Sequence, residues 1–133
     1  MSNLVLDTHV FLWLLEGNPK LPVSLRHLIN DPTNDLYLPA LAVAELVDLI
    51  GKGKSPLNVR DLEAALQSDL RLTVIAMSEE IALRTARFIA LSDIHDRCIV
   101  ATTAKLIETL GQAVLVTRDQ TIRDSGLVAT IWG

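Results

Sequence analysis

Four of the sixteen acidic residues occupy positions that suit a reactive site. Asp7 ends the first predicted β-strand, and Asp119 closely follows the fourth. Glu45 interrupts an apolar stretch, and Asp96 opens the longest predicted helix. Carboxylates gathered at one point cannot all ionise without a countercharge. With no His or Cys group of ligand spacing beside them, such oxygen ligands select a hard cation, Mg²⁺ or Mn²⁺, over zinc. A metal site of this kind can bind and cleave phosphate esters, because the metal polarises a phosphoryl oxygen and activates water.

Each of these acids also has an ordinary structural interpretation. Asp7 and Asp96 could cap the helices predicted to follow them, and Asp119 could be a turn residue. Glu45 is harder to explain in this way, because its sequence neighbours and the residues four positions away are apolar. A carboxylate in a buried stripe is costly unless a cation or hydrogen-bond donors meet it. The remaining ordinary interpretation is that Glu45 lies at the edge of the stripe.

The elements that must position these acids follow from the apolar pattern. Nearly continuous apolar runs predict short β-strands buried on both faces, over residues 4–6, 36–38, 72–75, 113–116 and 128–131. Helical spacing predicts helices over residues 8–16, 22–29, 40–50, 59–67, 78–90 and 96–110. Asn58 and Ser78 suit N-caps, and Gly111 suits a C-cap. Strands interleaved with helices predict a parallel α/β sheet with right-handed crossovers.

Sheet topology would bring the acids together. Residues that directly follow parallel strands share the carboxyl edge of the sheet, where ligands bind at a reversal of strand order. If the strand order is 3-2-1-4-5, the reversal lies between the strands that carry Asp7 and Asp119. Glu45 lies in the first turns after the second strand and so starts at the same edge. The order itself is an assumption at this point.

Composition limits the classes that remain. The chain has 133 residues and a mass of 14.6 kDa, which suits one domain over residues 1–133. The single cysteine, Cys98, excludes an internal disulfide and a cysteine-rich zinc site, and is expected to be inert core. We expect neither a signal peptide nor a membrane span, and a reducing, cytoplasmic location.

The net charge of −4 argues against bulk attraction of nucleic acid, so a nucleic-acid partner would need a local source of positive charge. Without the four singled-out acids, twelve acidic residues face twelve basic ones (16 − 4 = 12). The excess negative charge can therefore be assigned to the one proposed site.

Four motifs in this order resemble the PIN domain, and most closely the VapC-type ribonuclease toxins of toxin–antitoxin pairs. The motifs are Leu-Val-Leu-Asp-Thr-His at residues 4–9, Ala-Glu-Leu-Val-Asp-Leu at 44–49, Asp-Ile-His-Asp-Arg at 93–97 and Leu-Val-Thr-Arg-Asp-Gln at 115–120. The resemblance implies a three-layer α/β/α sandwich with a short, mostly parallel sheet of order 3-2-1-4-5. It also implies metal-dependent RNA cleavage, with Asp7, Glu45, Asp96 and Asp119 as catalytic residues and ligands of Mg²⁺ or Mn²⁺. Asp93 matches a further acid of this subgroup and is a poorer ligand candidate.

The resemblance also implies partners. We expect an RNA substrate, a homodimer and a cognate antitoxin whose C-terminal segment crosses the groove. An arginine of that segment would pair with the acids and displace the metal. The helices near the start carry Phe11, Leu12, Trp13 and Leu15, which is more apolar surface than one small sheet easily covers, and this also favours a dimer. A catalytically silent PIN-like module that binds RNA or protein is the alternative function.

Three residues beside the acids are candidates for substrate binding. The hydroxyl of Thr117 could bind a phosphate or the water of a metal, although such a threonine more often bonds to backbone. Arg97 and Arg118 could hold phosphates with two hydrogen bonds, or form ordinary ion pairs with neighbouring acids. Trp13 is expected to pack in the core or at a protein interface.

Overall fold

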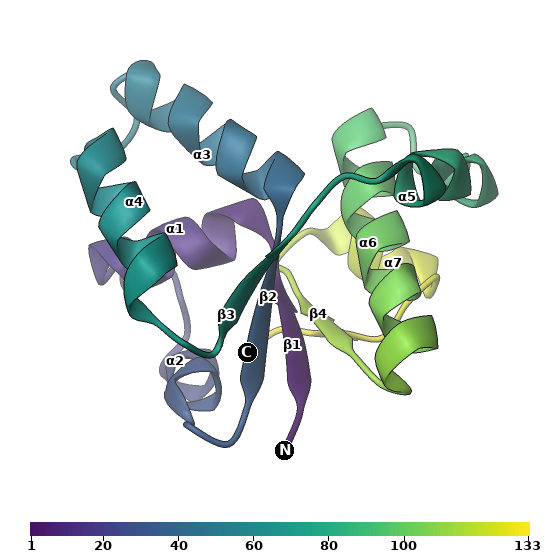
Figure 1. The fold of residues 1–133 in the computed structure, drawn as a ribbon, viewed down its shortest axis with the longest axis horizontal. Coiled ribbons are helices and arrows are strands. Elements are labelled where there is room, and N and C mark those ends of the chain that lie inside the picture. The colour runs from purple at the N-terminus through teal and green to yellow at the C-terminus, as the bar shows by residue number, and fades with distance from the viewer.

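A five-stranded parallel sheet lies between two layers of helices in the computed structural model, which describes residues 1–133 (Figure 1). The strands are β1 (Asn3–Leu6), β2 (Asp35–Pro39), β3 (Leu72–Ile75), β4 (Val114–Val116) and β5 (Thr130–Ile131). Their order in the sheet is β3-β2-β1-β4-β5, and every neighbouring pair is parallel. The predicted α/β/α fold and its strand order are confirmed.

Helices cover both faces of this sheet. One layer is formed by α1 (Thr8–Glu16), α2 (Val23–Asn30), α3 (Ala40–Gly51) and α4 (Val59–Ser68). The other is formed by α5 (Glu79–Arg84), the 3₁₀ turn η1 (Thr85–Phe88), α6 (Ile94–Leu110) and α7 (Gln120–Ser125). In Figure 1 the two layers lie on either side of the sheet, which is seen nearly edge-on.

The central strand β1 contributes side chains to both hydrophobic cores. Its side chains alternate between faces, so Leu4 and Leu6 pack with the first layer while Val5 packs with the second. All three residues are buried, as expected for a strand covered on both sides. Burial on both faces fixes the register of β1, because a one-residue slip would exchange the two sets of side chains.

Both edge strands depart from the expected burial, and β5 is also shorter than the predicted 128–131, with Ile131 37% exposed. Residues 72–75 were predicted to be buried on both faces, yet Thr73 and Val74 are exposed, and Val74 has 41% of its surface accessible. The prediction was wrong because β3 has one neighbouring strand, β2, and lies at the end of the sheet where the helical layers cover it less.

Helix ends agree with the sequence where a side chain caps them. Asn58 and Asp61 form a reciprocal capping box at α4, and Ser78 accepts a hydrogen bond from the Ile81 N–H at α5. Gly111 ends α6 with φ of 88°, a left-handed conformation that favours glycine.

Three helix predictions needed correction. The helix expected over residues 78–90 is interrupted after Arg84, where the Thr85 hydroxyl donates to the Ala82 carbonyl at 2.6 Å and favours a tighter turn. Helix α6 begins at Ile94, because Asp93 is its N-cap in place of Asp96. Helix α7 was not predicted, since its six residues are too short to show a clear apolar period.

The apolar residues of α1 do not form an exposed apolar surface. Phe11, Leu12 and Trp13 are all buried within the chain, and Trp13 packs against Trp132 with ring centroids 6.2 Å apart. Residues of α2–α4 and Trp132 pack in the same core, so the exposed apolar surface predicted for α1, which favoured a dimer, is absent. No helix combines the length and apolar character needed to cross a membrane.

Candidate active site

The acids meet at the carboxyl edge of the two central strands. Asp7 directly follows β1, Thr117 directly follows the neighbouring strand β4, and Asp119 comes two residues later. The backbone N–H of Asp7 donates to the Val116 carbonyl at 3.1 Å, so the two strand ends are joined at the site itself. This is the point of strand-order reversal that the sequence analysis selected.

Asp7 is held by hydrogen bonds at both carboxylate oxygens. Oδ1 accepts from the Thr8 N–H at 2.7 Å, which makes Asp7 the N-cap of α1, and Oδ2 accepts from the Thr117 hydroxyl at 2.6 Å. Burial raises the pKa of Asp7 above its ordinary value, although these two hydrogen bonds oppose the shift. The capping interpretation is therefore correct, and the second oxygen is held by the residue that follows β4.

Glu45 reaches the site from the second turn of α3. Its Oε1 accepts from the Thr8 hydroxyl at 3.1 Å, and its Oε2 lies 3.9 Å from His95 Nδ1. The side chain is 29% exposed, so Glu45 lies at the edge of the apolar stripe. Burial is the main cause that raises its pKa, and the charge of Asp7 adds to the shift. The side chain is thus oriented by Thr8 and held near the other acids.

Asp96 lies in the first turn of α6 and has no part in the cap. The cap is formed by Asp93, whose Oδ1 accepts from the His95 N–H at 2.8 Å. Burial first, and then repulsion from Asp119, Asp93, Asp7 and Glu45, raises the pKa of Asp96 to about 6. All four predicted acids therefore lie close enough to interact electrostatically.

Asp119 belongs to the site and to the unpredicted helix α7. Its Oδ1 accepts from the Ile122 N–H at 3.0 Å and caps the helix, and its own N–H donates to the Thr117 hydroxyl at 3.0 Å. The expected turn residue is thus an N-cap, and helix formation fixes the direction of its side chain.

The three candidates for substrate binding have different surroundings. Thr117 is fully buried, and its hydroxyl is engaged by Asp7 and by the Asp119 N–H, so the structure shows it positioning Asp7. Arg97 donates from Nε to the Leu91 carbonyl at 2.5 Å and ties down the loop before α6. Arg118 is exposed and lies over the Trp13 ring, 5.6 Å from its centroid. Direct contact of these residues with substrate stays a prediction.

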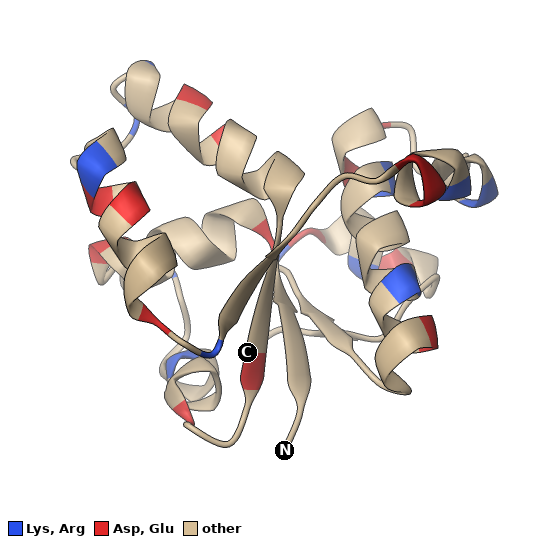
Figure 2. Cartoon of the chain, in the orientation of Figure 1, with Lys and Arg blue, Asp and Glu red and all other residues tan.

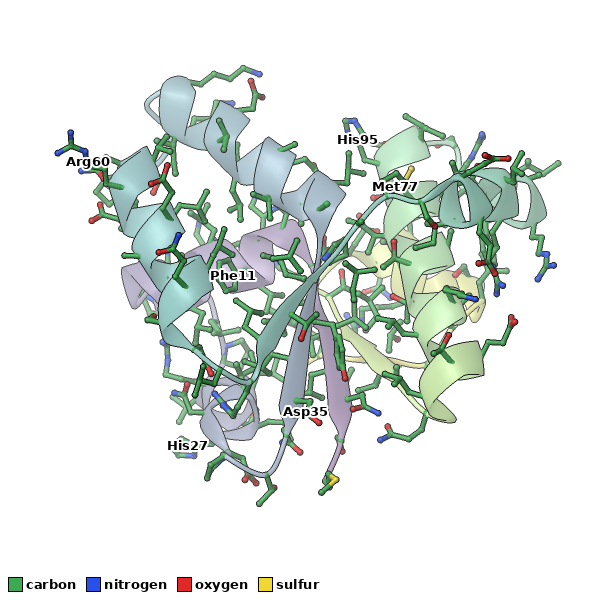
Figure 3. The ribbon with its side chains drawn as sticks, in the orientation of Figure 1. Phe11, His27, Asp35, Arg60, Met77 and His95 are labelled. Carbon is green, nitrogen blue, oxygen red and sulfur yellow. The ribbon has the colours of Figure 1, made fainter.

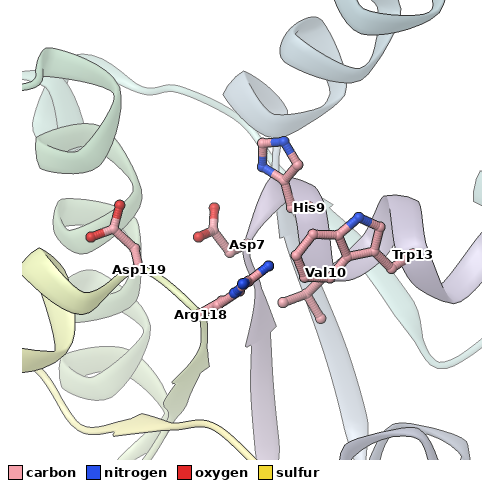
Figure 4. Close-up of a pocket in the computed structure, with 6 residues that line it drawn as sticks. All are labelled: Asp7, His9, Val10, Trp13, Arg118 and Asp119. Carbon is pink, nitrogen blue, oxygen red and sulfur yellow. The ribbon is translucent and has the colours of Figure 1, made fainter. Parts of the chain in front are cut away.

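A pocket of about 370 Å³ opens beside Asp7 and Asp119 (Figure 4). Its other lining residues are His9, Val10, Trp13 and Arg118. Neither His9 nor Trp13 was predicted from the sequence to lie in a binding site. Their i, i+4 spacing at the start of a helix that follows the first acid was a usable signal, because residues so spaced share one helix face.

The donor chemistry of the site fits Mg²⁺ or Mn²⁺. No three His, Cys, Asp or Glu side chains are gathered closely enough to form a ready-made metal site. Mg²⁺ needs no such group, since it commonly keeps several waters and takes one or two carboxylates together with substrate phosphates. Burial and then repulsion among the acids raise the pKa of Asp96, and a divalent cation among these oxygens would relieve the repulsion.

Comparison with known proteins identifies the class. The PIN-domain family model matches residues 4–126, and the chain belongs to the PIN-domain family. A comparison with curated protein sequences gave no match.

Solved structures with this fold include VapBC complexes and a VapC toxin. A structure of VapBC2 from Rickettsia felis, bound to a DNA fragment from its promoter, contains a chain with a TM-score of 0.67 and 16% identity, over 99% of this chain and 100% of that one. VapC20 from Mycobacterium tuberculosis, a toxin that cleaves the sarcin–ricin loop, has a TM-score of 0.65 and 14% identity, over 98% and 99%. DNA-bound VapBC from Salmonella typhimurium gives a TM-score of 0.64 and 19% identity, over 98% of both chains. At these identities the similarity shows the fold.

Proposed function

We propose that this PIN-domain protein is a Mg²⁺- or Mn²⁺-dependent endoribonuclease that acts as the toxin of a toxin–antitoxin pair. The observation that carries the proposal is the placement of Asp7, Glu45, Asp96 and Asp119 at one sheet edge, where their charges act on the Asp96 carboxyl. Family membership and the toxin–antitoxin relatives support the assignment to RNA cleavage.

The chain's own residues orient the reacting groups. The Thr117 hydroxyl and the Thr8 N–H hold the Asp7 carboxylate in one orientation, and the Thr8 hydroxyl does the same for Glu45. Asp7 and Asp96 would be the main metal ligands, with Glu45 and Asp119 completing the negative site. A divalent cation bound there would supply polarisation of the scissile phosphate and activation of water. Preorganised carboxylates avoid the cost of reorienting these groups during reaction.

The proposed partners follow from the relatives. An antitoxin would cover the site, with an arginine of its C-terminal segment paired to the acids in place of the metal. We propose a homodimer on the same family basis. The apolar residues of α1 do not support it, because they are buried within the chain. A ribonuclease that acts beside its antitoxin would work in the cytoplasm.

Substitution of Asp7 tests the function directly. Asp7→Asn keeps the shape and an oxygen that can cap α1, so the fold should survive while Mg²⁺-dependent RNA cleavage falls by about 100-fold or more. The measurement is cleavage of single-stranded RNA by the purified protein with Mg²⁺, with Mn²⁺ and with EDTA. Asp48→Asn is the matched control, because Asp48 is an exposed acid of α3 paired with Lys52. Full activity in Asp7→Asn would exclude the assignment, and no cleavage by the unsubstituted protein would favour the silent module.

A further inference from the structure

The pocket beside Asp7 has two chemically different walls. Asp7 and Asp119 form the acidic wall, and His9, Trp13 and Arg118 form a wall of aromatic and guanidinium groups (Figure 4). The second wall has no part in the proposed acid site. A ligand that fills the pocket would therefore contact the acids on one side and planar side chains on the other.

Trp13 organises the second wall from below the surface. Only 7% of the residue is exposed, and its ring packs at 6.2 Å from Trp132 and at 5.7 Å from His9, measured between ring centroids. Arg118 and Lys20 lie over the ring at 5.6 and 5.9 Å from its centroid. The ring thus holds the Arg118 guanidinium at the pocket through a cation–π interaction.

This wall provides local positive charge in a protein of net charge −4. Acidic and basic segments are interspersed over both helical layers in the view of Figure 2, with no large basic stretch. Arg118 lines the pocket beside the acids and Lys20 shares the Trp13 ring with it, so an RNA chain that approaches the pocket would meet positive charge there.

We propose that this pocket receives one unstacked nucleobase of single-stranded RNA, next to the phosphate that lies at the acids. The base stacks against Arg118 and His9, and Trp13 is the positioning residue that holds Arg118 in place. Aromatic and guanidinium planes are the groups on which proteins stack splayed RNA bases, and every base offers a π-face to them. The inference deepens the proposed RNA cleavage and rests on it.

Two oligomers test whether the pocket binds a base. The first is a fluorescein-labelled single-stranded RNA of about eight nucleotides, and the second is an abasic ribose-phosphate oligomer of the same length. Affinity is measured by fluorescence anisotropy with Mg²⁺ in an Asp96→Asn background, which blocks cleavage and leaves every pocket-lining residue intact. We expect the base-bearing oligomer to bind about 5- to 100-fold more tightly than the abasic one.

Variants of the wall should remove this preference. Arg118→Gln and His9→Ala change exposed side chains. Each should bring the affinity ratio, the affinity for the base-bearing oligomer divided by that for the abasic one, close to one without altering the melting temperature. Trp13→Leu should do the same, with rescue by Trp13→Phe, which a merely structural role would not produce. Arg60→Gln is the matched control, because it removes the same charge from an exposed position of α4 outside the pocket (Figure 3). Its ratio should equal that of the parent.

The outcomes separate this inference from the function on which it rests. A ratio near one in the parent, or a ratio that Arg118→Gln and His9→Ala leave unchanged, overturns the base pocket, even if the unsubstituted protein cleaves RNA. A ratio that the wall variants abolish supports the pocket, and a lack of cleavage by the unsubstituted protein would then contradict the nuclease alone.

Discussion

The two carboxylate oxygens of Asp7 have different partners, so capping a helix leaves this acid compatible with its proposed role in the site. One oxygen accepts the first N–H of α1, and the other accepts the hydroxyl of Thr117. The two interpretations of Asp7 in the sequence are therefore compatible. Because both hydrogen bonds come from residues fixed in the fold, the acid is oriented before any ligand arrives.

Removing the charge of Asp96 should stabilise the metal-free protein at neutral pH. Burial and four neighbouring acids raise the pKa of Asp96 to about 6 from an ordinary value of 3.8. The folded state therefore binds more protons than the unfolded state between about pH 4 and 6, and the free energy of unfolding decreases as the pH rises through this window. Solvent screens this half-exposed group, so Asp96→Asn should raise the melting temperature at pH 7 by only about 3 °C.

The measurement is a series of thermal melts in EDTA at pH 4, 5, 6 and 7. The gain from Asp96→Asn should shrink towards pH 4, where the native aspartate is itself protonated. Asp48→Asn, at an exposed and ion-paired acid, should show no such gain. A gain for Asp96→Asn that is equal at all four pH values would contradict loss of the Asp96 charge as its cause.

At the scale of elements, α7 and the site depend on the same acid. Asp119 caps the helix through the Ile122 N–H, and loss of an N-cap costs about 0.5–2 kcal/mol. We predict that Asp119→Ala lowers the melting temperature by about 2–6 °C, while Asp119→Asn keeps the cap and lowers it by much less.

Cleavage assays on the same two variants separate the cap from the charge. Both should cleave RNA more slowly, since neither carries the negative charge of Asp119. If Asp119→Asn retained full cleavage while Asp119→Ala lost it, the acid would act through the helix alone.

The sequence predicted those elements whose own residues determine them. Helices α1 and α4 begin where an Asp or Asn caps them, and β1 is recognisable because both of its faces are buried. The exposure of Thr73 and Val74 could not be predicted, because it depends on the position of β3 at the sheet edge. At the end of α5 the Thr85 hydroxyl donates to the Ala82 carbonyl, a local hydrogen bond that leaves no periodic signal in the sequence.

The site was predictable to the extent that topology places it. Position after a parallel strand was enough to bring Asp7 and Asp119 together, and the assumed strand order proved correct. The pocket was not predictable in this way, because Arg118 and Trp13 come from distant parts of the chain and meet only through packing. His95, near both Asp93 and Glu45, likewise requires the α3 and α6 helices to be placed in space (Figure 3).

On the scale of the whole molecule, the fold concentrates uncompensated charge at one place. The sheet joins two separate cores, and α1, α3, α6 and α7 each bring an acid at or beside their first turns to its carboxyl edge. Burial raises the pKa of Asp7 and Glu45, and burial together with repulsion raises that of Asp96. The folded state therefore carries an electrostatic cost at neutral pH that the unfolded chain, with its acids far apart, does not.

A divalent cation should lower this cost and stabilise the whole protein. A ligand that binds only the folded state adds about 1.4 kcal/mol when its free concentration is tenfold above Kd, which corresponds to a rise of about 3–7 °C in melting temperature. We expect this rise with Mg²⁺ or Mn²⁺ at pH 7, and its reversal by EDTA.

NaCl at equal ionic strength should not reproduce the rise in melting temperature, because general screening differs from binding at the site. Glu45→Gln should reduce the rise, and a variant that neutralises all four acids should abolish it. An equal rise in that variant and in the unsubstituted protein would show that the cation binds elsewhere, and the acids would then have no role as its ligands.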